Sequence, residues 1–68
     1  MPFRDFTGFN LATLRIMTAA YDTAIARLGI KTTDPMTSAL ALKIVALAKA
    51  GERDPNQICD RALAELGQ

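Results

Sequence analysis

Apolar side chains recur along most of the chain at intervals of three and four residues, which is the period of an amphipathic α-helix. The pattern predicts three helices, over about residues 11–28, 35–50 and 55–66. No segment alternates with the period of two that is typical of a half-buried strand. The 68 residues are therefore predicted to form one all-α domain, a small three-helix bundle, preceded by an irregular N-terminal arm over residues 1–9.

Each predicted helix begins beside a residue that favours helix starts. Asn10, Asp34 and Asp54 can all accept a hydrogen bond from a first-turn N–H, and each aspartate is followed by a proline, which suits the first helical position. Gln57 would complete a capping box with Asp54. These residues predict where the chain enters each helix.

The connectors between the helices are short. Gly29 and Gly51 stand where a left-handed residue would end the first and second helices. Because only residues 30–33 separate the end of the first helix from the next N-cap, we expect the second helix to run antiparallel to the first.

The apolar positions of each helix define the face that we expect to be buried. On a helix drawn with 100° per residue, most of them fall on one side. The expected faces are Leu11, Leu14, Met17, Thr18, Tyr21, Ala24, Ile25 and Leu28 in the first helix, Met36, Leu40, Ile44, Leu47 and Ala48 in the second, and Ile58, Cys59, Ala62, Leu63 and Leu66 in the third.

The central helix has apolar residues on a second face as well. Residues 39–50 are interrupted only by two lysines, and Leu42 and Val45 lie away from the first apolar face. In one interpretation both are covered, because the middle helix of a bundle contacts two neighbours. In the other, Leu42 and Val45, with Ile16 on the outer side of the first helix, form a candidate interface for a second copy or a partner helix.

Two phenylalanines of the N-terminal arm, Phe3 and Phe6, are further candidate interface residues. They could cover the open end of the bundle, or they could form a docking arm that orders on binding. Deletion of residues 1–7 would reduce stability only in the first case.

The charge balance argues against a nucleic-acid or membrane-surface protein. Eight basic and seven acidic residues give a net charge of +1. The second and third helices could be interpreted as a helix-turn-helix, with Lys49, Arg53 and Arg61 as cationic contacts. A DNA-binding protein usually supplies more phosphate contacts than these, so weak nucleic-acid binding is the alternative hypothesis.

The residues needed for common catalytic and metal sites are missing. The chain has no histidine, and its one cysteine, Cys59, cannot form an internal disulfide. No glycine-rich phosphate loop is present, and Ser38 has no histidine to activate it. We therefore expect no catalytic residue, cofactor or metal, and Cys59 is interpreted as a small core side chain, with a reactive thiol sensor as the alternative.

The N-terminus lacks a basic segment followed by a long apolar run, and no apolar segment reaches the roughly 20 residues of a membrane helix. These features predict a cytoplasmic protein of bacterial type with a reduced thiol.

The string AKAGERDP at residues 48–55, followed by Ala62 and Leu63, resembles small uncharacterised helical proteins of α-proteobacteria. An upstream leucine-rich helix, here around Asp22, is a further point of resemblance, and the similarity covers residues 11–66. The resemblance implies a helical fold and a bacterial source, and it brings no activity or ligand with it. Together with the missing chemistry, it leads us to expect a non-enzymatic interaction or regulatory module.

Overall fold

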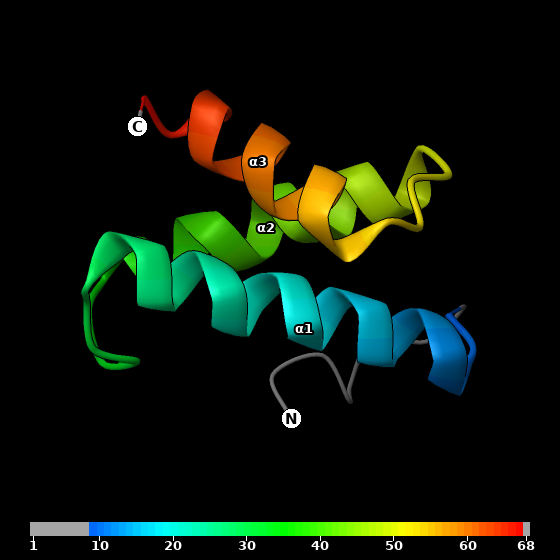
Figure 1. The fold of residues 1–68 in the computed structure, drawn as a ribbon, viewed down its shortest axis with the longest axis horizontal. Coiled ribbons are helices and arrows are strands. Elements are labelled where there is room, and N and C mark those ends of the chain that lie inside the picture. The colour runs from blue at the N-terminus through cyan, green and yellow to red at the C-terminus, as the bar shows by residue number, and fades with distance from the viewer. Residues whose placement is uncertain (1–8, 68) are drawn as a thin grey trace.

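The computed structural model describes residues 9–67, and this part of the chain forms three helices and no strand (Figure 1). They are α1 (Leu11–Leu28), α2 (Met36–Lys49) and α3 (Pro55–Glu65). The all-α three-helix prediction is therefore confirmed, with boundaries that differ from the predicted ones by at most one residue. Apart from Phe9, the predicted N-terminal arm lies outside the described residues.

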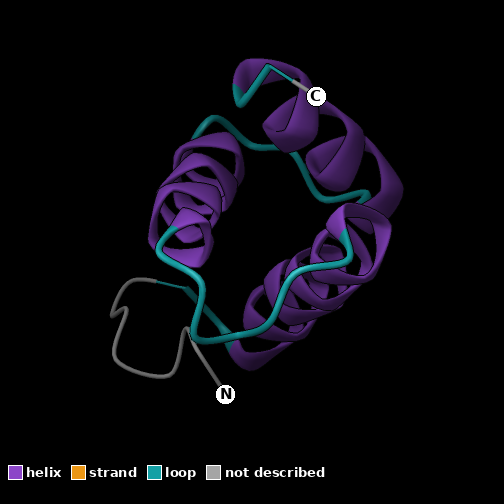
Figure 2. Cartoon of the chain, turned by 90° about the vertical axis from the view of Figure 1, so that its left-hand side faces the viewer, coloured by secondary structure: helices purple, strands orange, loops and turns teal. Residues whose placement is uncertain are grey.

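The helices form an up-down-up bundle. Figure 1 shows α2 returning along α1 and α3 running again in the direction of α1. Viewed end-on in Figure 2, the helices occupy three corners around a common centre, and each helix packs against both of the others. This arrangement requires every helix to bury a wide face.

Local hydrogen bonds fix the ends of α1. The Asn10 side chain accepts a hydrogen bond of 2.8 Å from the backbone N–H of Thr13. At the other end Gly29 adopts a left-handed conformation with φ of 66°, and its N–H donates to the carbonyl of Ile25 at 3.0 Å. Both predicted caps are confirmed.

Local hydrogen bonds also fix the ends of α2, although its N-cap is Pro35 and not the predicted Asp34. Asp34 Oδ1 accepts a hydrogen bond of 2.9 Å from the N–H of Met36, the first helical residue. After the helix, Gly51 has φ of 100°, and the N–H of Glu52 donates back to the carbonyl of Leu47 at 3.1 Å. This 6→1 bond is characteristic of a Schellman ending, which needs a left-handed residue at the position of Gly51.

The start of α3 confirms one prediction and corrects another. Asp54 Oδ1 accepts a hydrogen bond of 2.9 Å from the N–H of Asn56, so Asp54 is the N-cap. The capping box with Gln57 is wrong. The Asp54 N–H that Gln57 would have accepted donates instead to Oε1 of Glu52, at 3.2 Å.

The core is built from all three helices. Its buried apolar members are Met17, Ala20, Tyr21 and Ala24 of α1, Leu40, Ile44, Val45 and Ala48 of α2, and Ile58, Cys59, Ala62 and Leu63 of α3. The inner face of α3 matches the prediction, with Leu66 half-buried at its edge.

The buried face of α1 differs from the predicted one. Leu11 is 58% exposed, whereas Thr13 and Ala20 are buried. The true face is rotated by roughly 60° from the predicted one, at 100° per residue. The small side chains of Ala20 and Ala24, both fully buried on this face, allow the neighbouring helices to approach closely.

Within residues 9–67, no helix is both long enough and apolar enough to cross a lipid bilayer.

Candidate interaction surface

One side of α2 stays in contact with solvent along its whole length. Its exposed residues follow one another at intervals of one to four positions, and we call this set the outer face of α2: Ser38, Ala39, Leu42, Ala46 and Lys49. Leu42 is the largest apolar side chain of this face and is 65% exposed. A helix of the bundle therefore presents a leucine between two alanines to solvent.

The side of α2 opposite the outer face is buried, so only part of the candidate interface is exposed to solvent. Leu40, Ile44 and Ala48 are fully or almost fully buried, and the side chain of Val45 is only 6% exposed. Of the two interpretations of this face, the one in which both residues are covered holds for Val45, and the one in which both are exposed holds for Leu42. Because α2 packs against both α1 and α3, its buried arc is wide enough to include Val45.

The remaining candidate interface residues are not brought together with Leu42 on an open patch. Ile16 is half-buried and packs against the core, so it is not the exposed side chain that the interface hypothesis required. Phe3 and Phe6 lie outside the described residues. Of the three predicted interface residues that the structure describes, Leu42 alone is strongly exposed.

Two lysines accompany the outer face of α2. At 100° per residue, Lys43 and Lys49 lie on opposite sides of the line from Leu42 to Ala46. Lys43 is half-buried and Lys49 is exposed. Helix α2 contains no Asp or Glu, and neither lysine forms an ion pair with another residue in the range 9–67. In the sequence analysis Lys43 appeared only as an interruption of an apolar run, and Lys49 also as a candidate contact for nucleic acid.

Two other cations of the described residues, Arg27 and Arg61, have acidic partners on the surface of the bundle. Arg27 of α1 forms an ion pair with Asp60 of α3. The hydrogen bond to Asp60 raises the pKa of the Arg27 guanidinium above its ordinary value. This contact joins two helices across the surface and leaves less of the Arg27 charge available to a ligand.

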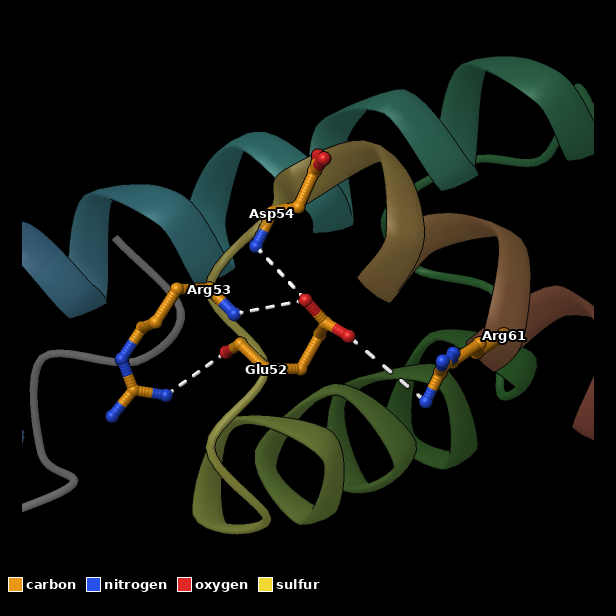
Figure 3. A network of polar contacts seen from close by, with 4 residues as sticks. All are labelled: Glu52, Arg53, Asp54 and Arg61. Carbon is orange, nitrogen blue, oxygen red and sulfur yellow. Dashed lines mark hydrogen bonds and ion pairs between the residues drawn. The ribbon is translucent and has the colours of Figure 1, made fainter.

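Glu52 lies at the centre of a polar network in the connector between α2 and α3 (Figure 3). Its Oε1 accepts hydrogen bonds from the backbone N–H groups of Arg53 and Asp54, at 3.1 and 3.2 Å. Its Oε2 lies 3.9 Å from Nη1 of Arg61. The network connects the loop to α3. It was not predicted from the sequence, because Gln57 was expected to accept the hydrogen bond from the Asp54 N–H.

The Arg53 side chain has a structural role in the same connector. Its Nη1 donates to the carbonyl oxygens of Ala48 and Glu52, at 2.7 and 2.9 Å. Arg53 thus satisfies carbonyl groups at the C-terminus of α2, a common role of arginine at helix ends. Of the three cations considered for nucleic-acid binding, Arg53 and Arg61 have partners within residues 9–67, whereas Lys49 has none there.

Cys59 is fully buried on the inner face of α3. Burial raises the pKa of its thiol, and the nearby Arg27 charge opposes this effect without overcoming it. A protonated, enclosed thiol packs as a small apolar side chain, whereas a reactive cysteine needs a lowered pKa and access to solvent.

Over the part of the chain that the structure describes, no pocket is found, and no three His, Cys, Asp or Glu side chains are grouped to hold a metal ion. Comparisons with protein-family models, with curated proteins and with solved structures yield no match. The candidate site is therefore the surface of the bundle, and above all the outer face of α2.

Proposed function

We propose that this chain is a small non-enzymatic interaction module of the bacterial cytoplasm, which binds another protein through the outer face of α2. One observation carries the proposal: Leu42 is 65% exposed in the middle of a well-formed helix, although the bundle has a complete core without it. The side chain contributes little to folding where it stands, so a role in binding is the better explanation for the surface that it forms.

The neighbours of Leu42 support this interpretation. A single exposed leucine is common on protein surfaces. Here, however, Ala39 and Ala46 lie one turn before and after Leu42 on the same side, and both are exposed. Small residues on either side of a larger apolar one let a partner helix approach closely and cover the leucine. Covering an apolar side chain of this size is worth roughly 1.5–3 kcal/mol when it is complete.

The proposal is tested by site-specific photo-crosslinking in living bacterial cells that produce the chain. A photoreactive phenylalanine analogue replaces Leu42 in one variant and Ala64, an exposed residue of α3, in the matched control. We expect a discrete protein adduct from position 42 that is missing from position 64. The same adducts from both positions, or no protein adduct from position 42, would refute the proposal.

The alternative of nucleic-acid binding makes an opposite prediction. With Arg53 and Arg61 bonded inside the chain, few free cations remain on α2 and α3 to contact phosphates. We expect no retardation of random duplex DNA by micromolar protein at low salt. Retardation that is lost in the Lys49→Ala variant would favour the nucleic-acid hypothesis over the proposed one.

A further inference from the structure

The charges on α2 identify the chemistry of the partner. Resting on the function proposed above, we propose that the outer face of α2 binds an amphipathic helix that carries Asp or Glu residues beside its apolar stripe. Three features of α2 support this: the spacing of its exposed apolar residues, the position of its two lysines and the size of its exposed face.

The spacing of the exposed apolar residues fits a helical partner. Ala39, Leu42 and Ala46 are separated by three and four residues, the repeat by which one helix packs along another. Helix α2 has 14 residues, which at 1.5 Å per residue gives a length of about 21 Å. A partner helix of about two heptads would cover this face from end to end.

The lysines determine the charge of that helix. Lys43 and Lys49 lie on the two sides of the apolar stripe, where the flanking residues of a packed helix pair face each other. Both lack an acidic partner within residues 9–67, unlike Arg27 and Arg61. The half-buried Lys43 stem can also cover part of the partner's apolar surface while its ammonium group reaches a carboxylate. An acidic flank on the partner complements both positions.

A second copy of the chain is a poorer occupant of this face. Because α2 contains no acidic residue, two copies paired through it would bring lysines toward lysines. For any occupant, a strip about 21 Å long and about 10 Å wide is small beside the roughly 800 Å² per partner of a stable complex. The expected contact is therefore a transient one with a different, acidic helix.

The test uses two synthetic helical peptides of about two heptads with the same leucine and alanine stripe, one flanked by Glu and the other by Lys. Each is titrated into the ¹⁵N-labelled full chain, and backbone amide shifts are followed. We expect the Glu peptide to shift amides of the outer face of α2, with a dissociation constant roughly tenfold lower than that of the Lys peptide at low salt. The difference should shrink as the salt concentration rises.

Two variants act as controls. The double substitution Lys43→Glu and Lys49→Glu should reverse the preference between the peptides, while Leu42→Ala should weaken binding of both. Circular dichroism checks that each variant is folded. Equal binding of the two peptides would overturn the acidic assignment alone, since the proposed function asks only that a protein binds. The acidic assignment would also be overturned if neither peptide shifted the α2 amides, or if dilution of the chain itself shifted them. The proposed function is tested separately, by the crosslink at position 42.

Discussion

Leu40 and Leu42 provide a matched test of how the structure divides α2 between core and surface. The two residues are identical in chemistry and two positions apart in the same helix, yet Leu40 is fully buried and Leu42 is 65% exposed. The same substitution, leucine to alanine, therefore has a different physical meaning at each position. At Leu40 it opens a cavity between three helices, and at Leu42 it removes atoms that mostly contact water.

The expected changes in the free energy of unfolding differ severalfold. Truncation of a fully buried leucine costs about 2–5 kcal/mol, because transfer free energy is lost and the cavity is only partly refilled. At Leu42 about one third of the side chain is covered, so the loss is below about 1 kcal/mol, and the better helix propensity of alanine offsets part of it. A domain of this length has a total stability of roughly 3–10 kcal/mol, so Leu40→Ala removes a large share.

Urea denaturation followed by circular dichroism at the helical band measures both variants against the parent chain. We expect a much lower midpoint for Leu40→Ala, or a chain that is unfolded before urea is added, and a nearly unchanged midpoint for Leu42→Ala. If the two variants lost similar free energy, Leu42 would be part of the core, and the surface on which both proposals rest would not exist.

Two further outcomes follow from single residues. At Gly29, φ is 66° and an added Cβ would meet no atom within 4 Å, so Gly29→Ala should cost about 1 kcal/mol through backbone strain alone. The melting temperature should fall by roughly 4–8 °C, less for Gly29→Asn, and an unchanged value for Gly29→Ala would contradict the left-handed ending of α1. At Cys59, burial raises the pKa of the folded thiol above its unfolded value of about 8.5. The stabilisation is complete below that pH and is lost as pH rises toward the folded pKa, because the unfolded chain releases the proton first. The urea midpoint should therefore decline more steeply above about pH 8.5 in the parent chain than in Cys59→Ala, and equal slopes would show that the thiol is not enclosed.

Helix positions could be predicted from the sequence because helix ends depend on interactions within a few residues. Asn10 bonds to an N–H three residues away, and Gly29 adopts a backbone conformation that other residues reach only with strain. The buried face of α3 could be predicted as well, because all apolar residues after its first position, apart from Ala64, share one side of the helix. A local pattern of this kind leaves one way to pack the helix against the others.

The distribution of burial on α1 and α2 was decided by the tertiary structure. Thr13 is buried and Leu11 is exposed. The direction in which the neighbouring helices cross α1 decides which of its faces is covered, and this need not be the most hydrophobic face. Likewise, the apolar pattern grouped Val45 with Leu42. Only the packing of α2 against both α1 and α3 buries Val45 in the core and leaves Leu42 on the surface. The sequence thus determined three helices and their ends through local hydrogen bonding, whereas the packing angles of the bundle determined which leucine remains available to a partner.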